Sequence, residues 1–307
     1  MKKIVVFGSY VTDLYIKTAC FPKIGETVRG HDFTNGPGGK GSNQAVAAHR
    51  ADGDVTLVTK LGRDSFGKLA LDFYREEGLN TEHVLLDDTC ETGCAFIMLN
   101  DISAQNQIIV NSGACGNITE AETEKVFALL DDADILLTQL ETNIEPVLKL
   151  LSYAKAHHVL TVLNPAPAAP IDLDAYQNVD IITPNETETE LLTGIHVENA
   201  SDAEKAAAVF AERGVQKVII TLGEMGVYAN DGASSQLIPA WKSSTAVDTT
   251  GAGDCFSGTF AAALSEGIDF FEAARFAVCA AGISVTRKGT APAMPYYGEI
   301  LDAFNQK

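Results

Sequence analysis

In residues 246–256 the chain reads Ala246-Val247-Asp248-Thr249-Thr250-Gly251-Ala252-Gly253-Asp254-Cys255-Phe256. The stretch begins like a strand, breaks at the glycines and continues as a helix, because Phe256, Phe260 and Ala263 recur at helical spacing. The glycines therefore lie at a predicted helix N-terminus, where unpaired N–H groups and a partial charge of roughly +0.5 favour phosphate.

Asp254 lies beside this predicted phosphate site. A carboxylate there would repel the ligand, unless it accepts a proton from a nucleophile that attacks the phosphate. The alternative is that Asp254 only occupies the first helical turn, where acidic residues are favourable. A lone acidic residue would favour that alternative, but the glycines and the Asp248-Thr249-Thr250 approach favour a catalytic base.

The segment from Asp248 to Asp254 resembles the C-terminal signature of the ribokinase family of sugar kinases, also called the phosphofructokinase-B type. Further stretches between Gly8 and about Gly289 match this family in the expected order. The resemblance implies an α/β fold, a three-layer αβα sandwich with a mainly parallel central sheet and a small β-sheet lid. It assigns 1–12, 37–90 and 112–307 to the core, and 13–36 and 91–111 to the lid.

Length and composition set wider limits. A chain of 307 residues can form one large α/β domain or two smaller ones, and a net charge of −19 argues against nucleic acid and anionic membranes as partners. The apolar run after Met1-Lys2-Lys3 is too short for a secretory signal, and no segment approaches the roughly 20 apolar residues of a membrane span. We expect a cytoplasmic protein whose six cysteines are free thiols.

The predicted first strand, residues 3–8, is followed by Asp13. A carboxylate just past a first strand often marks a ligand crevice, and Glu141 similarly follows the predicted strand 135–140. The resemblance implies that both bind the sugar, whereas the alternative for Asp13 is an ordinary turn residue. Residues 55–61 predict another strand.

Several predicted strands follow one another without helices between them. They are residues 14–16 and 28–33 and the predicted hairpin of 93–99 with 107–110. This clustering predicts a small sheet apart from the α/β body. In the family such a sheet is a lid over the sugar and commonly a dimer contact, so a homodimer through the lid is expected.

The glycine cluster Gly36-Pro37-Gly38-Gly39-Lys40-Gly41-Ser42-Asn43 is not a P-loop, because Gly41 separates Lys40 from Ser42. It resembles the N-terminal signature of the family. The resemblance implies that the backbone of Gly39 and Gly41 meets the sugar and that Lys40 and Asn43 donate to its hydroxyls. A flexible loop without a ligand is the alternative.

Asn185 and Glu188 have the spacing of a capping box, which needs no metal. The resemblance implies that they also order Mg²⁺ and its waters at the nucleotide phosphates. It further implies that Thr221, Gly223, Gly226 and Gly253 line the ATP site. The first two glycines otherwise predict a hairpin turn.

The family also binds a monovalent cation, usually K⁺, largely through backbone oxygens. The residues that the resemblance assigns to this site are Asp248, Thr250, Ser284, Arg287 and Gly289. Ala293 occupies a nearby position where ribokinases often have Ser.

The resemblance implies transfer of the γ-phosphate of ATP to the 5-hydroxyl of a pentose, most simply D-ribose. Asp254 would accept the hydroxyl proton, and the amides of Gly251, Ala252 and Gly253 would neutralise charge on the phosphate. Val11 departs from the family, which typically has Asn there to bond a sugar hydroxyl. 2-Deoxy-D-ribose is therefore the alternative, with ketohexoses and nucleosides behind it.

Two other classes of protein are alternatives for this sequence. A sugar-binding regulator on a kinase fold would have lost its chemistry, but the base and the anion site are both present in Asp254 and Gly251-Ala252-Gly253. A dinucleotide-dependent dehydrogenase is disfavoured because the first strand ends in Gly8-Ser9-Tyr10-Val11, without GxGxxG.

Overall fold

The computed structural model describes residues 2–103, 105–241 and 245–306. Within them the larger sheet has the strand order β14-β13-β12-β11-β10-β9-β1-β4. Pairing is parallel from β4 to β12 and antiparallel from β12 to β14. The strands are β1 (Lys3–Phe7), β4 (Asp54–Val58), β9 (Ile135–Gln139), β10 (Leu160–Asn164), β11 (Ile181–Ile182), β12 (Lys217–Thr221), β13 (Val227–Asn230) and β14 (Ser235–Ile238).

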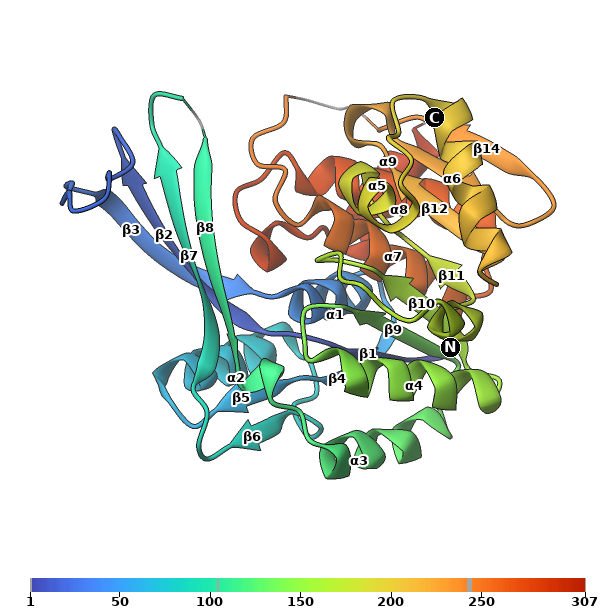
Figure 1. Cartoon of the computed structure of the whole chain (residues 1–307), viewed down its shortest axis with the longest axis horizontal. Helices are drawn as coiled ribbons and strands as arrows, with labels where there is room; N and C mark the ends of the chain where they lie inside the picture. The colour runs from blue at the N-terminus through green and yellow to red at the C-terminus, as the bar shows by residue number, and fades with distance from the viewer. Residues whose placement is uncertain (1, 104, 242–244, 307) are drawn as a thin grey trace.

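Helices cover both faces of this sheet (Figure 1). Successive residues of a strand point to opposite faces, so Ile4 and Val6 of β1 join one apolar core while Val5 and Phe7 join the other. The three-layer αβα sandwich is confirmed. The helices are α1 (Lys40–Arg50), α2 (Ser65–Glu77), α3 (Glu120–Leu130), α4 (Ile144–Ala156), α5 (Glu186–Thr193), α6 (Ala200–Glu212), α7 (Ala252–Ser265), α8 (Phe270–Ser284) and α9 (Tyr297–Asn305).

A second sheet, with the order β3-β2-β7-β8, projects to one side of the sandwich (Figure 1). The predicted hairpin is confirmed, since β7 and β8 pair antiparallel. The strand expected at 28–33 lies instead at 31–38, where it pairs with β2. The strands are β2 (Val11–Thr18), β3 (His31–Gly38), β7 (Thr92–Asn100) and β8 (Asn106–Gly113).

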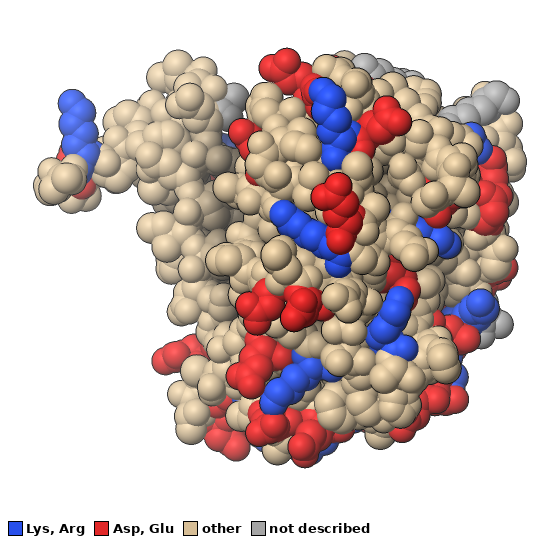
Figure 2. All heavy atoms as spheres, turned by 45° about the vertical axis from the view of Figure 1, so that its right-hand side comes forward, with Lys and Arg blue, Asp and Glu red and all other residues tan. Residues whose placement is uncertain are grey.

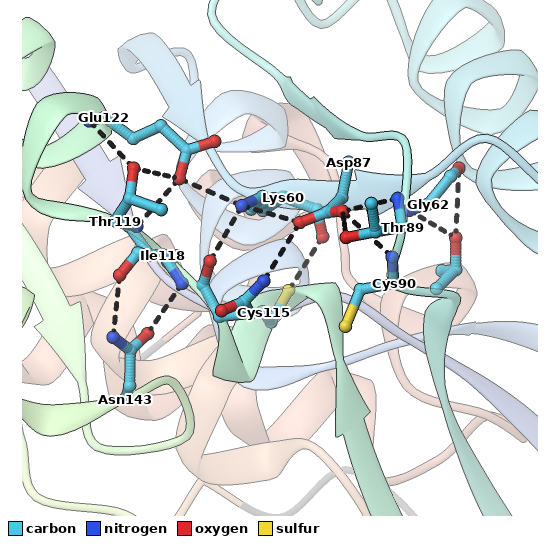
Figure 3. Close-up of polar contacts among 12 residues, drawn as sticks. Lys60, Gly62, Asp87, Thr89, Cys90, Cys115, Ile118, Thr119, Glu122 and Asn143 are labelled. Carbon is cyan, nitrogen blue, oxygen red and sulfur yellow. Dashed lines mark hydrogen bonds and ion pairs between the residues drawn. The ribbon is translucent and has the colours of Figure 1, made fainter.

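The strand expected at 55–61 is divided at Thr59. Its first part is β4 of the larger sheet, whereas β5 (Lys60–Gly62) pairs with β6 (Leu85–Asp87) in a separate ribbon. The side chain of Lys60 explains the division, because it is 3% exposed and lies between Asp87 and Glu122 at 2.8 and 2.9 Å (Figure 3). A charged group buried this deeply needs ionic partners, and the ribbon brings it to them.

We call Lys60, Asp87, Asn117 and Glu122 the Lys60 cluster. The ammonium also donates to the carbonyl oxygen of Asn117 at 2.7 Å. Residues 87–92 lead into β7 and residues 113–117 lead out of β8, so both connections of this hairpin meet at Lys60 (Figure 3). The cluster anchors the base of the second sheet to the sandwich.

Helices α1 and α7 cross at very short range. A Cβ atom at Gly258 of α7 would lie 2.2 Å from the carbonyl oxygen of Gln44 in α1 and 2.8 Å from Cβ of Ala47. Only glycine fits without moving the backbone. The close crossing holds the N-termini of the two helices beside each other.

The surface carries mixed charge. Figure 2 shows Lys and Arg side chains interspersed with acidic ones over the face in view. Among the described residues, no helix combines the length and the apolar character needed to cross a membrane.

Candidate active site

A pocket lies at the carboxyl ends of the parallel strands, where ligands of α/β sheets bind. Asn164 ends β10, Thr183 follows β11 and Thr221 ends β12. The first residues of α1 and α7 face them. The lining residues are Lys40, Asn164, Ala166, Thr183, Asn185, Glu188, Thr221, Thr249, Gly251, Ala252, Gly253 and Asp254.

The N-terminus of α7 forms one wall of this pocket. Gly251 is its N-cap, with a φ of 79° in the left-handed region that glycine tolerates. The N–H groups of Gly253 and Asp254 have no acceptor within residues 2–103, 105–241 and 245–306. They are therefore available to an anion in the pocket.

The approach to α7 is not a strand, which corrects the sequence prediction for Ala246 and Val247. The N–H groups of Val247 and Asp248 both donate to the carbonyl oxygen of Val285, at 2.7 and 3.1 Å. The loop is thus tied to the end of α8 instead of pairing with a neighbouring strand.

Asp254 is 5% exposed and is held by two amides of α1. Asn43 Nδ2 donates to its Oδ2 and Gln44 Nε2 to its Oδ1, each at 3.0 Å. Asn43 Oδ1 has no partner among the described residues, so it remains free to accept from a ligand hydroxyl. Sequence reasoning included Asn43 but missed Gln44.

A usable signal for Gln44 was present. It is a polar residue on a helix that continues Ala45-Val46-Ala47-Ala48, and such a residue on a buried face needs a partner. Its partners Gln139, Asn164 and Asp254 lie 95 to 210 residues away in sequence, which is why local spacing did not reveal them.

Lys40 begins α1, and its side chain lines the pocket opposite Thr221 and Glu188. Asp254 is the main cause of a raised pKa for the Lys40 ammonium, with Glu141 and Glu188 adding to it. The Lys40 cation thus shares the pocket with Asn185 and the free amides of α7, and its predicted role as a donor to sugar hydroxyls stays a prediction.

Asp13 and Glu141 lie next to this pocket. Glu141 Oε2 accepts from the backbone N–H of Lys40 at 2.8 Å and from the hydroxyl of Ser9. Asp13 is 7% exposed and accepts from the Tyr15 hydroxyl at 3.1 Å. Burial, together with the charges of Glu141 and Asp254, raises the pKa of Asp13 to about 7.

Gly39 and Gly41 are required for packing. A Cβ atom would lie 2.6 Å from the Tyr10 Cα at Gly39 and 2.4 Å from the Gly8 carbonyl carbon at Gly41. Gly39 also has a φ of 87°. The two glycines let the start of α1 press against the end of β1, which brings Lys40 and Asn43 to the pocket.

Val11 lies on the same face of β2 as Asp13, because alternate strand residues share a face. It is 3% exposed and clusters with Ala95 and Ile97 of β7. The wall beside Asp13 is therefore apolar at this point.

Asn185 and Glu188 form the predicted capping box of α5, with bonds of 2.9 and 2.8 Å. Glu188 is 8% exposed, and burial raises its pKa. Glu188 and Asn185 both line the pocket, and their oxygens are of the kind that hold the water shell of Mg²⁺.

Thr221 pairs with Asn185 as an isolated parallel bridge at the pocket. Gly223 and Gly226 instead lie in a turn between β12 and β13, where Leu222 donates to Gly226 at 2.8 Å. The turn interpretation of these two residues is confirmed, and their expected role at the ATP site stays a prediction.

The segments predicted to bind a monovalent cation lie together. The Asp248 carboxylate accepts from the N–H groups of Thr250 and Gly289, at 3.0 and 3.1 Å. Ser284 accepts from the Arg287 N–H through its carbonyl oxygen at 3.0 Å. The binding of a monovalent cation by these segments stays a prediction. Among the described residues, no group of three His, Cys, Asp or Glu gathers as a metal cluster.

Known proteins share this architecture. The family model of the pfkB family carbohydrate kinases matches residues 1–296. A ribokinase of Haemophilus influenzae is 41% identical over 301 residues, 98% of each chain. A deoxyribokinase of Salmonella typhimurium is 35% identical over 304 residues, 99% of this chain and 97% of the relative. The solved structure of Arabidopsis thaliana ribokinase complexed with ribose and ATP has a TM-score of 0.93 at 31% identity, over 99% and 98% of the two chains.

The αβα sandwich, the buried Asp254 and the helix N-terminus beside it define a phosphotransferase that acts on an alcohol group. The chain belongs to the pfkB family of carbohydrate kinases, so the acceptor is a sugar hydroxyl.

Proposed function

We propose that this protein transfers the γ-phosphate of ATP to the 5-hydroxyl of D-ribose and forms D-ribose 5-phosphate. The observation that carries the proposal is the buried Asp254 carboxylate beside the free amides of α7, in one pocket with Lys40. The 41% identity to a ribokinase over 98% of both chains supports ribose as the sugar.

In this mechanism Asp254 accepts the proton of the 5-hydroxyl as its oxygen attacks the γ-phosphorus. The bond from phosphorus to the bridging oxygen of ADP breaks, and ADP leaves. The N–H groups of Gly253 and Asp254 and the Lys40 ammonium neutralise charge on the transferred group. Asp13, Glu141 and the free Oδ1 of Asn43 accept from the other sugar hydroxyls.

Two cations complete the proposal. Asn185 and Glu188 would hold the water shell of Mg²⁺, which lowers the negative charge of the nucleotide phosphates. Oxygens around Asp248, Thr250, Ser284, Arg287 and Gly289 would hold K⁺ and keep the α7 approach in shape. The proposed compartment is the cytoplasm.

2-Deoxy-D-ribose is the second candidate sugar. The apolar wall of Val11, Ala95 and Ile97 offers no partner to a hydroxyl, and a polar group left unpaired in a closed site costs about 1–3 kcal/mol. The 35% identity to a deoxyribokinase also supports this candidate.

The second sheet is proposed as a lid over the sugar and as a homodimer contact. Its outer face exposes Phe33, Phe96 and Ile109, which are 61%, 54% and 67% exposed. Register places Phe96 opposite Ile109, so they share this face. A second copy of the chain would cover them.

The experiment is ADP release with Mg-ATP and K⁺, with D-ribose, 2-deoxy-D-ribose, D-fructose and adenosine as acceptors. The highest kcat/KM is expected for D-ribose, and a preference for the deoxy sugar would replace ribose by the second candidate. Asp254→Asn should lower kcat by at least roughly 10³-fold because the base is lost, while sugar binding measured by calorimetry stays within about 3-fold. Activity retained by this variant would rule out Asp254 as the base.

A further inference from the structure

Gln44 joins three separate parts of the active site. Its Nε2 donates to Asp254 Oδ1 at 3.0 Å and to Asn164 Oδ1 at 3.1 Å, and its Oε1 accepts from Gln139 Nε2 at 2.6 Å. These bonds connect the second turn of α1 with the ends of β9 and β10 and with α7. All four side chains are at most 6% exposed.

Its neighbours fix the orientation of the Gln44 amide. Asn164 Nδ2 donates to the carbonyl oxygen of Thr183 at 2.7 Å, so Asn164 presents its oxygen to Gln44. Asp254 Oδ1 also accepts, and the group between two acceptors must be the NH₂ of Gln44. Gln44 therefore presents its oxygen to Gln139, so the amide nitrogen of Gln139 is the group that donates to it.

Each oxygen of the Asp254 carboxylate is thereby engaged by one amide, Oδ1 by Gln44 and Oδ2 by Asn43. A carboxylate bonded on both oxygens cannot turn about its last side-chain bond. The lone pairs that remain keep a fixed direction, and proton transfer depends on that alignment.

We infer that Gln44 is a positioning residue for the phosphoryl transfer, that Gln139 holds Gln44 in the required orientation, and that the two act as one unit. The inference rests on the proposed function of Asp254 as general base. Gln44 contacts Asp254 but does not line the described pocket, so its loss should slow the chemical step more than it weakens binding.

The test is a double-mutant cycle with Gln44→Met and Gln139→Met. Gln44→Met should lower kcat roughly 10- to 100-fold, with KM for sugar and for ATP within about 3-fold of wild type. Gln139→Met should lower kcat about 3- to 10-fold. Because Gln139 acts only through Gln44, the double variant should match Gln44→Met within about 2-fold.

Thr138→Val is the matched control. Thr138 precedes Gln139 on β9, points to the opposite face and has a buried hydroxyl without a partner among the described residues. Its kcat should stay within about 2-fold of wild type. Thermal unfolding and calorimetric sugar binding identify variants that are folded.

Additive losses in the cycle, a KM that rises as far as kcat falls, or a fully active Gln44→Met would each overturn the inference. If Asp254→Asn is inactive while Gln44→Met is fully active, only the positioning role of Gln44 is overturned, and the proposed function stands. If Asp254→Asn is active, Asp254 is not the general base, and the positioning role of Gln44 fails together with the proposed mechanism.

Discussion

Asp13 combines a buried carboxyl with two acidic neighbours. Burial, Glu141 and Asp254 together raise its pKa from the ordinary value of 3.8 to about 7. The folded protein therefore binds this proton more tightly than the unfolded chain does. The free energy of unfolding therefore falls as pH rises from about 4 to 7, and this loss of stability is complete above pH 7.

Asp13→Asn should thus stabilise the ligand-free protein at pH 8 while it weakens sugar use. Its Tm at pH 8 should rise by at least roughly 3 °C and its Tm at pH 5 by much less. Wild-type kcat/KM for the sugar should fall as pH drops through about 7, because the protonated carboxyl loses acceptor capacity. Scanning calorimetry and steady-state kinetics measure both effects.

Asp88→Asn is the control, since Asp88 pairs with Arg63 at the surface and is 77% exposed. It should move Tm by less than about 1 °C at either pH. An equal gain at pH 5 and pH 8 in Asp13→Asn would contradict the raised pKa.

The local pattern around Asp254, together with the resemblance to a known family, identified much of this site. Asp254, Asn43, Glu188 and Thr221 were predicted, and the structure places them around one pocket or in contact with it. Their roles toward ligands remain predictions. Gln44 was missed because its contacts to Asp254 and Gln139 span 210 and 95 residues, and no local pattern encodes such contacts.

At the scale of elements, the Lys60 cluster decides where the hairpin β7–β8 is attached. The hydrogen bond from Lys60, with those from the N–H groups of Thr89 and Cys90, lowers the pKa of Asp87. Because the pKa is lowered, ionised Asp87 stabilises the fold at pH values above the ordinary pKa of a carboxyl group. This stabilisation is lost as pH falls.

Lys60→Met should therefore destabilise the protein strongly at pH 7. Without the cation, two carboxylates remain in a buried site, and Tm should fall by at least roughly 5 °C. The difference from wild type should narrow below about pH 4, where the carboxylates take up protons. Scanning calorimetry across pH tests this.

Lys68→Met serves as the matched control, because Lys68 pairs with Asp72 in the open and is 77% exposed. It should change Tm by less than about 1 °C. A loss in Lys60→Met that persists undiminished at pH 3 would exclude the ionic explanation.

Strands with strong local patterns were predicted within one residue, as at β1 (3–8 expected) and β9 (135–140 expected). The division at Thr59 was not predicted, because the apolar pattern continues into Leu61 and only the burial of Lys60 turns the chain. The prediction of a strand before α7 was wrong for a related reason. The N–H groups of this segment donate to the carbonyl oxygen of Val285, which sequence spacing cannot anticipate.

At the scale of the whole molecule, the outer face of the second sheet is the least covered apolar area described above. Phe96→Glu should convert a protein of twice 32.6 kDa into one of 32.6 kDa, since a charge would be buried in the contact. Light scattering after size-exclusion chromatography gives the mass. Leu191→Glu, at a 70% exposed position of α5, should leave the mass unchanged. A wild-type monomer at high concentration would disprove the homodimer.

The crossing of α1 and α7 has a consequence for how this chain can diverge. Gly258 lies a full turn from Asp254, contacts the backbone of Gln44, and leaves no room for a methyl group. If Val11 faces the sugar as proposed, its side chain can be exchanged without moving the helices, and the exchange should alter which acceptor fits. A larger residue at 258 would shift both helices together and misalign every acceptor equally. We therefore expect sugar preference to change through substitutions at position 11, whereas a larger residue at position 258 should abolish activity toward all sugars.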